Sequence, residues 1–393
     1  MKILMYEWKI FGKQDIIDSF EKLGHTVRCI TTDRIMDREN VSFDQSFQEE
    51  IRKESYDFVF TINYSPILSN NCEREGLKYI SIIYDSPLVS LYSYTIIHKC
   101  NYVFLFDSAL YQELRDGGIN TVYYMPLAVN MDRLDAMEQT EAIKKIFSCD
   151  VSFLGSMYTE KYTFFDRLKN LSEYSRGYLD SIMNAQLKVY GDFFVQDLLN
   201  GEVLKELKEK MPYTPNKDGI ETPEYIYANY FIGRKLAEME RRNLLGEVSE
   251  QFQTRVYTHN PTPQLPKVEN MGSIDYYLNM PYAFRYSKIN LNITLRTIRT
   301  GIPLRAMDIM GAGGFLMTNY QADLMRHFVP GEDFVNFESE QDLLDKCRYY
   351  LEHEEERARI ALSGQEKIRQ FHNYPLRLQQ IIEICMGNVT NES

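Results

Sequence analysis

The chain has 393 residues, of which 44% are hydrophobic and 25% are charged, and its formal net charge is −12. These proportions are those of a globular protein of about two domains. The negative charge argues against nonspecific binding to nucleic acid or anionic lipid as the main activity. The first residues resemble no signal peptide, because Glu7 interrupts their short apolar run, and no apolar stretch reaches the roughly 20 residues that a membrane span needs.

Short apolar runs alternate with helical segments in the first third of the chain. Residues 15–25 have apolar positions at helical spacing and end at Gly24, between runs at 2–6 and 26–31. Further strands are predicted within four β-rich runs: 56–62, 78–87, 101–107 and 121–129. Strands buried on both faces with helical crossovers predict a parallel, doubly wound sheet. We place this Rossmann-like N-terminal domain at residues 1–140.

A second α/β series follows, with a helical insertion after its first strand. Its strands are predicted within five runs: 149–156, 255–260, 267–273, 288–294 and 314–320. The insertion, at about 158–252, has helical patterns throughout. "KVYGD" (188–192) could form a strand and a phosphate-binding turn, but the flanking periodicity favours a helix. The second Rossmann-like domain is placed at 141–372, and a helix at 373–393 is expected to return toward the first domain.

The segment "GIPLRAMDIMGAGGFLMTN" (301–319) contains a helix followed by glycines. Pro303 suits the first turn of a helix, which is predicted from about Ile302 to Met310. Gly311, Gly313 and Gly314 follow this helix and precede a strand, the reverse of a dinucleotide-binding fingerprint. They are expected to end the helix and turn the chain, so that phosphate would bind at the helix start instead.

Three arginines lie close to this helix start, namely Arg296, Arg299 and Arg305. Guanidinium groups suit a diphosphate, although a solvated basic turn would have the same composition. Asp308 lies one turn after Arg305 and could accept hydrogen bonds from ribose hydroxyls or form an ion pair with Arg305. The spacing does not distinguish the two.

Three carboxylates lie at predicted strand ends in the N-terminal domain. Ligands of open α/β sheets bind at this edge, and we expect the strand ends of the two domains to face a common cleft. Glu7 and Asp107 could line that cleft, although Asp107 also has the position of a helix N-cap. Asp85, followed by Ser86 and Pro87, is the preferred candidate for a general base.

The sequence has no signature of a metal site or of a common hydrolase. The six histidines form no ligand cluster, and D-x-D, G-x-S-x-G and P-loop motifs are absent. We therefore expect no metal ion and no other cofactor, with arginines and helix dipoles neutralising charge. The cysteines are scattered without a C-x-x-C pair, which is typical of reduced thiols and predicts a cytoplasmic protein.

The C-terminal sequence, from "SKINLNITLRTIRTGIPLRAMDIMGAGGFLMTNY" to "FHNYPLRL", resembles the GT-B glycosyltransferases of the CgeB-like group. "YDSPLVSLY", "FLFD" and "YYMPLAVN" are similar to the DUF3880 region that accompanies that group. The resemblance implies a metal-independent glycosyltransferase. Its C-terminal domain would bind a nucleotide-sugar donor, a UDP-sugar by preference, and its N-terminal domain the acceptor.

The resemblance also assigns site residues. Asp308 matches the acid that binds the donor ribose, whereas Thr300 stands where many relatives have the first Glu of a Glu-x7-Glu pair. Arg299 and Arg305 would neutralise the leaving diphosphate, with Arg305 also counted as catalytic. The donor pocket is expected to include five further residues: Gly155, Tyr257, Gly272, Asn292 and Gly313.

The proposed reaction is transfer of a sugar to a hydroxyl of a glycan, polysaccharide or protein. Asp85 would be the base of an inverting enzyme, whereas a retaining enzyme would need no such base. Two alternatives remain open from the sequence: a GT-B-fold sugar-nucleotide epimerase, and a non-catalytic sugar-binding or scaffold module. Nucleic acid is not an expected partner.

Overall fold

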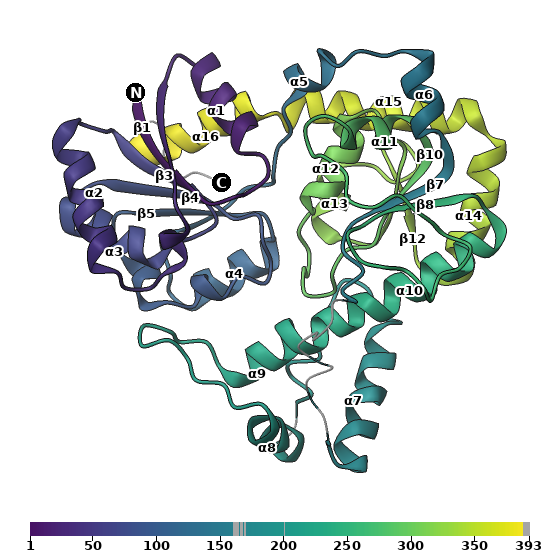
Figure 1. The fold of residues 1–393 in the computed structure, drawn as a ribbon, viewed down its shortest axis with the longest axis horizontal. Helices are drawn as coiled ribbons and strands as arrows, with labels where there is room; N and C mark the ends of the chain where they lie inside the picture. Colours follow the sequence, from purple (N-terminus) through teal and green to yellow (C-terminus); the bar gives the residue numbers. More distant parts are fainter. Residues whose placement is uncertain (160–164, 166–167, 169, 200, 388–393) are drawn as a thin grey trace. The chain divides into compact units, whose positions relative to one another are not determined.

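The computed structural model describes residues 1–159, 165, 168, 170–199 and 201–387 (Figure 1). The chain divides into two compact units. The first consists of Met1–Arg133, Pro215–Glu221 and Phe371–Ser393, and the second of Leu134–Thr214 and Thr222–Gln370. Each unit contains a six-stranded sheet with helical connections. The predicted α/β class, with two doubly wound Rossmann-like domains, is therefore confirmed.

The first unit contains a wholly parallel sheet in the order β2-β1-β3-β4-β5-β6. Its strands are β1 (Lys2–Glu7), β2 (Thr26–Thr31), β3 (Phe58–Ile62), β4 (Lys78–Ile82), β5 (Asn101–Leu105) and β6 (Val122–Tyr124). All six lie within the predicted runs or extend them by one residue. The side chains of β3 are buried on both faces of the sheet, as expected for a central parallel strand.

Helices connect these strands and cover the sheet. They are α1 (Lys13–Lys22), α2 (Val41–Lys53), α3 (Pro66–Glu75), α4 (Ser108–Asp116) and α16 (Tyr374–Met386), with short 3-10 turns η1 (Asp33–Met36), η2 (Val89–Leu91) and η3 (Tyr94–Ile97). Helix α5 (Met131–Asp135) contains the boundary at which the chain passes from the first unit to the second. The C-terminal helix α16 packs against α1 within the first unit (Figure 1). Gly24 ends α1 with a φ of 79°, a conformation that glycine adopts without strain.

The second unit contains a parallel sheet in the order β12-β11-β10-β7-β8-β9. Its strands are β7 (Cys149–Leu154), β8 (Thr254–Tyr257), β9 (Glu269–Asn270), β10 (Ser287–Asn292), β11 (Leu316–Asn319) and β12 (Val335–Phe337). The sequence analysis did not predict β12, which is too short to show a period. The strand order reverses between β7 and β10, and such a switch point is where ligands of open α/β sheets bind.

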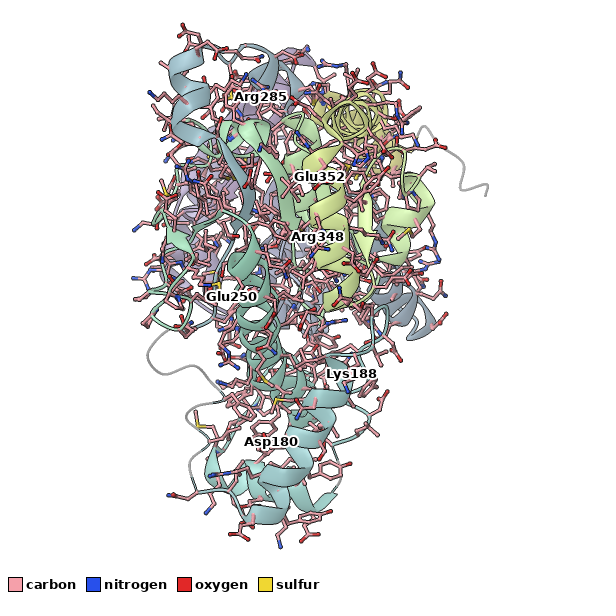
Figure 2. All side chains as sticks on the ribbon, turned by 90° about the vertical axis from the view of Figure 1, so that its right-hand side faces the viewer. Asp180, Lys188, Glu250, Arg285, Arg348 and Glu352 are labelled. Carbon is pink, nitrogen blue, oxygen red and sulfur yellow. The ribbon has the colours of Figure 1, made fainter. Side chains whose placement is uncertain are left out.

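Helices surround the second sheet. They are α6 (Glu141–Phe147), α10 (Gly233–Gln251), α11 (Met280–Tyr286), α12 (Leu304–Gly311), α13 (Ala322–His327), α14 (Glu340–Glu352) and α15 (Glu354–Phe371). Helices α10 and α14 pack side by side, and Arg348 donates a hydrogen bond of 2.8 Å to Gln251 between them (Figure 2). Helix α10 thereby joins the insertion firmly to the sheet.

The insertion between β7 and β8 is helical, as predicted. It contains α7 (Glu173–Gln186), α8 (Gly201–Lys210), α9 (Pro223–Ile226) and a π-helical turn (Tyr227–Ile232) that leads into α10. The predicted helix over 188–192 is wrong, since "KVYGD" forms a turn and an irregular segment after α7. Gln186 stabilises this exit by donating hydrogen bonds to the carbonyls of Val189 and Asp192.

A short piece of the insertion, Pro215–Glu221, belongs to the first unit. Its backbone pairs with the loop between η2 and η3, where Ile220 N–H donates to the carbonyl of Tyr92 at 2.8 Å. Arg38 and Asp218 form an ion pair of 3.0 Å at the same place. The sequence analysis did not predict this association, because nothing in local periodicity reports contacts between distant segments.

Candidate functional site

The connection from β10 to α12 forms the centre of the candidate site in the second unit. Gly301 and Ile302 are buried, and Pro303 stands immediately before the first turn of α12. The N–H groups of a first helical turn lack partners within the helix and, with the helix dipole, attract anions. The structure therefore places the start of α12 at the carboxyl edge of the sheet, as the sequence predicts.

Arg305 extends from the first turn of α12. Its Nη1 contacts Sδ of Met280 at 2.7 Å, and its guanidinium lies 5.5 Å from the centre of the Phe284 ring. Burial lowers the pKa of Arg305, the charge of Asp308 opposes this effect, and the charge of Arg241 adds to it. Arg305 is thus a cation held against apolar groups, with a second cation nearby.

Arg241, on α10, is the second cation. Its Nη1 donates to the carbonyl of Ser156, after β7, at 2.5 Å, and its Nη2 to the carbonyl of Ile293, after β10, at 2.8 Å. The side chain is only 8% exposed, and its Nε has no hydrogen-bond partner among the described residues. Arg241 therefore lies at the switch point of the sheet, where the strand order reverses.

The two guanidinium groups have the charge to attract an anion. Neither Arg241 nor Arg305 makes an ion pair with any residue that the structure describes. Burying a charge without a partner is costly, and bringing two like charges together adds to that cost. A bound anion would offset both costs, and a diphosphate has the charge and the oxygen atoms to do so.

Asp308 lies one turn beyond Arg305 on α12 and is only 5% exposed. The hydroxyl of Tyr276, in the loop after β9, donates a hydrogen bond of 3.2 Å to its Oδ1. The alternative reading of Asp308, an ion pair with Arg305, does not occur between these two described residues. Asp308 thus stands beside the anion site with its carboxylate oriented by a tyrosine.

Arg296 has a structural role, which corrects its assignment to the diphosphate. It forms a buried ion pair of 2.7 Å with Glu240 and donates to the carbonyls of Leu187 and Val189. Its guanidinium also lies 3.7 Å from the centre of the Tyr190 ring. These contacts connect the insertion to the sheet. Arg296 therefore bonds groups of the protein and is not placed to bind a diphosphate.

The other predicted donor residues fall in several places. Gly155 lies beside Arg241, because a Cβ added there would meet Nη1 of that arginine at 3.8 Å. Gly272 turns the chain after β9 with a φ of 74°, and Arg299 lies partly exposed between β10 and α12. Asn292 is buried at the end of β10, where it donates to the hydroxyls of Thr294 and Thr318 at 2.9 Å.

Gly313 lies away from the start of α12, which corrects its assignment to the donor pocket. Gly313 follows the other end of α12 with a φ of 78°, and helix length alone separates it from the first turn by roughly 12 Å. Tyr257 ends β8 and lines a cavity of ≈ 460 Å³ with Ile146, Met271 and Tyr282, and its place in the donor pocket remains a prediction. The structure confirms that the glycines after α12 form a turn behind the site.

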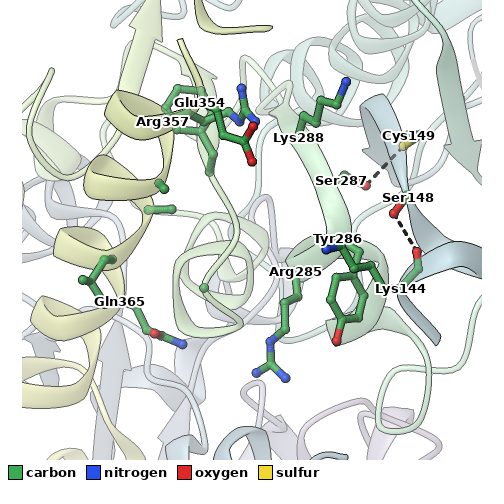
Figure 3. Close-up of a pocket in the computed structure, with 15 residues that line it drawn as sticks. Lys144, Ser148, Cys149, Arg285, Tyr286, Ser287, Lys288, Glu354, Arg357 and Gln365 are labelled. Carbon is green, nitrogen blue, oxygen red and sulfur yellow. Dashed lines mark hydrogen bonds between the residues drawn. The ribbon is translucent and has the colours of Figure 1, made fainter. Parts of the chain in front are cut away.

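The cavity drawn in Figure 3, of ≈ 390 Å³, belongs to this rear side of the unit. Residues at the starts of β7 and β10 line it, together with Gly313. Arg285 and Gln365 donate to the carbonyls of Ala312 and Gly311 there and satisfy the C-terminal end of α12. Since ligands of such sheets bind at the opposite edge, this cavity is not the candidate donor site.

The carboxyl edge of the first sheet carries the three predicted carboxylates. Glu7 is 2% exposed, and its Oε1 accepts hydrogen bonds from Lys13 at 2.9 Å and from Thr31. Asp107 caps α4, as its position suggested, by accepting from the N–H groups of Ala109 and Leu110. Asp107 is thus used as a helix cap, whereas Oε2 of Glu7 is buried without a hydrogen-bond partner among the described residues, and the contact of either residue with an acceptor remains a prediction.

Asp85 differs from these two because it is exposed to solvent. Its Oδ2 accepts a hydrogen bond of 2.7 Å from Nδ2 of Asn63, a residue that the sequence analysis did not select. Loss of hydration raises the pKa of Asp85, and the hydrogen bond from Asn63 acts against this. A carboxylate with a raised pKa at a strand end has the chemistry of a general base.

The sequence analysis also missed Arg241 and Tyr276. Arg241 lies four residues after Ala237 and three before Leu244, so it shares the buried face of α10 with apolar side chains. A charged residue on the apolar face of a helix is a signal that could have identified it. Tyr276 lies in an irregular loop and offers no comparable signal.

Neither a metal-binding cluster nor a membrane-spanning helix occurs among the described residues. No group of three or more His, Cys, Asp or Glu side chains among them is arranged to hold a metal ion. In the same residues, no helix has the length and apolarity that a membrane crossing requires. The expected independence from metal remains a prediction.

Comparison with known proteins finds a family model that is similar to the C-terminal part of the chain. Residues 234–383 match the family model described as glycosyl transferase-like. This match covers β8 to β12, α12 with Arg305 and Asp308, and Arg241 on α10. No curated protein sequence matches the chain.

Solved structures of similar fold include several glycosyltransferases. The chain is 12% identical to a glycosyltransferase from Rickettsia africae ESF-5, with a TM-score of 0.55 and coverage of 100% of this chain and 99% of that chain. It is 10% identical to Anabaena Alr3699/HepE in complex with UDP-glucose (TM-score 0.55; 99% and 100% covered). It is also 10% identical to T4 phage BGT in complex with UDP-glucose (TM-score 0.52; 98% and 99% covered). The chain thus shares the GT-B fold of these structures.

Proposed function

We propose that the protein transfers a sugar from a nucleoside-diphosphate donor, by preference a UDP-sugar, to an acceptor hydroxyl. The observation that carries this proposal is the pair Arg241 and Arg305 at the carboxyl edge of the second sheet. Both are cations without an ion-pair partner among the described residues, and Asp308 stands beside them. The family match over 234–383 covers all three residues and supports the same function.

Different groups of this site would bind different parts of the donor. Arg241, Arg305 and the first N–H groups of α12 would bind the diphosphate, which carries most of the negative charge. Asp308, oriented by Tyr276, would accept hydrogen bonds from the ribose hydroxyls. HepE and T4 phage BGT, which share the fold, were crystallised with UDP-glucose, and this supports uridine as the base.

The reaction follows from this distribution of charge. As the bond between the anomeric carbon and the β-phosphate oxygen breaks, its electron pair passes to the diphosphate. The two guanidinium groups would stabilise that developing charge. The acceptor oxygen forms the new bond to the anomeric carbon and loses its proton. In an inverting transfer, Asp85 would take this proton.

Finer features of the function belong to the same proposal. The CgeB-like and DUF3880 subgroup, the independence from metal ions and a glycan, polysaccharide or protein acceptor rest on the sequence resemblance. The cytoplasmic location rests on the pattern of cysteines. The charge pair of Arg241 and Arg305 could serve in place of a metal ion, and activity in the presence of EDTA would test this.

A thermal-shift panel of nucleotides and nucleotide sugars tests the function. A ligand that binds only the folded state raises the unfolding temperature by mass action. UDP and UDP-sugars should raise it more than the corresponding ADP and GDP compounds, and the best donor should then be consumed when acceptors are added. Conversion of a UDP-sugar without acceptor would indicate an epimerase, and binding without turnover a sugar-binding module. If no nucleotide shifts the transition, the proposal is wrong.

A further inference from the structure

Asn63 occupies an unusual backbone position at the carboxyl edge of the first sheet. It follows the last residue of β3 and has a φ of 63°, in the left-handed region. Its N–H donates to the carbonyl of Ile82 at 2.8 Å, and its carbonyl accepts from the hydroxyl of Thr61 at 2.7 Å. Left-handed residues other than glycine are uncommon and cluster at functional sites.

The side chain of Asn63 binds the segment that carries Asp85. Its Oδ1 accepts from the N–H groups of Tyr84 at 2.9 Å and of Asp85 at 3.1 Å. Its Nδ2 donates to Oδ2 of the Asp85 carboxylate at 2.7 Å. One amide therefore fixes both the backbone and the carboxylate of Asp85.

These contacts leave the two oxygens of Asp85 in different states. Oδ2 is occupied by Asn63, whereas Oδ1 has no hydrogen bond to any residue in the described part of the chain. Asp85 as a residue is exposed, and Oδ1 is the carboxylate oxygen that these contacts leave for a further hydrogen bond. If Asn63 only stabilised the turn, its hydrogen bonds to backbone groups would be enough. Its hydrogen bond to the Asp85 carboxylate goes beyond what the turn requires.

We propose that Asn63 is a positioning residue that orients Asp85, so that Oδ1 accepts the proton of the acceptor hydroxyl. The inference rests on the proposed glycosyl transfer and makes that transfer inverting. The acceptor oxygen bonds to the anomeric carbon, the bond from that carbon to the diphosphate breaks, and the diphosphate leaves with the electron pair. The acceptor proton moves to Oδ1, while Oδ2 keeps its hydrogen bond to Asn63.

Variants of Asn63 and Asp85, including one that exchanges their side chains, distinguish a positioning role of Asn63 from a merely structural one. In N63D the carboxylate still accepts from the two backbone N–H groups but can no longer donate to Asp85. In the double variant N63D/D85N the amide and the carboxylate exchange places, so one hydrogen bond between them is retained. N63G removes the side chain and is compatible with a φ of 63°.

An NMR titration of the Asp85 carboxyl carbon reports on its hydrogen bond to Asn63 and does not depend on an activity assay. N63G should raise the pKa of Asp85, because a donor to the charged form is lost, and N63D should raise it further through like charge. Transfer by both single variants should fall by roughly 10- to 1000-fold, and UDP affinity should stay within about 2-fold. The double variant N63D/D85N should regain the unfolding temperature that N63D loses, but it should not regain the transfer activity.

Three results would overturn the inference. One is an unchanged titration of Asp85 in a folded N63G and N63D. Another is full activity of either single variant, and the third is recovery of activity together with stability in N63D/D85N. A failure of the proposed function looks different: UDP would not bind to the wild-type protein, while the titration of Asp85 would still respond to Asn63.

Discussion

The hydroxyl of Tyr276 donates a hydrogen bond of 3.2 Å to Oδ1 of Asp308, and both side chains are buried. This bond joins the loop after β9 to α12, the helix whose start forms the candidate anion site. It orients the carboxylate that we assign to the ribose of the donor. The assignment gives the first prediction.

Replacement of Asp308 with alanine should weaken binding of UDP but leave binding of inorganic pyrophosphate unchanged. Hydrogen bonds to a charged group contribute roughly 1.5–3 kcal/mol, so a loss of about 10- to 100-fold is expected for UDP. Y276F should give a smaller loss in the same direction. Isothermal titration calorimetry of both ligands measures the difference, with Y349F, on the exposed face of α14, as the matched control. Equal losses for UDP and pyrophosphate would place Asp308 at the phosphates instead.

Replacement of Arg296 with methionine should lower stability without changing the affinity for UDP. Removing one partner of its buried ion pair with Glu240 leaves an uncompensated charge, which costs roughly 3–5 kcal/mol. The double variant R296M/E240L should recover much of that loss. Urea unfolding gives the free energies, and a UDP titration gives the affinity. If R296M weakened UDP binding while unfolding normally, the original assignment of Arg296 to the diphosphate would be right.

The glycines behind α12 should tolerate alanine poorly. Gly313 has a φ of 78°, which costs a residue with a side chain roughly 1–2 kcal/mol. At Gly314, an added Cβ would lie 2.7 Å from the carbonyl oxygen of Phe284, so G314A should lose more. G177A, within α7 and with open space around it, should instead gain about 0.5–1 kcal/mol. Thermal unfolding of the three variants tests the ranking, and a neutral G313A would contradict it.

Activity should fall at acid pH in a way that depends on Asp85. Asp85 must be deprotonated to accept a proton, and loss of hydration raises its pKa above the usual value of about 3.9. The acid limb of kcat/KM should therefore lie at higher pH than for an ordinary aspartate, with activity present above the raised pKa and lost as the pH falls through it. D85N should remove the limb along with most of the activity. A D85N protein with wild-type transfer would point to a retaining enzyme.

Most of the fold could be predicted from the sequence, because the relevant signals are local. The alternation of apolar runs predicted eleven of the twelve strands in the described residues. Gly24 and Gly313 follow the ends of helices with positive φ angles, which glycine adopts readily, as the sequence predicted. "KVYGD" was predicted wrongly, since helical periodicity on both sides does not report the turn that Gln186 stabilises through side-chain bonds.

The site was less predictable, because its groups come from distant segments. Asp308 and Arg305 follow a strand and could be selected by position. Arg241 is separated from the carbonyl of Ser156 by the whole insertion, and only the structure brings the two together. Arg296 resembled a phosphate ligand in the sequence because its partner, Glu240, is also distant along the chain.

The affinity difference between UDP and uridine tests the central claim most directly. Calorimetry should be performed on the wild-type protein, R305M, R305K and the control R348M, whose side chain is exposed on α14. The account predicts that the wild type binds UDP far more tightly than uridine. R305M should lose roughly 10- to 100-fold in UDP affinity alone, R305K should lose less, and R348M should lose nothing. Equal binding of UDP and uridine by the wild type, or an R305M protein that is folded and binds UDP normally, would contradict a diphosphate site at the start of α12.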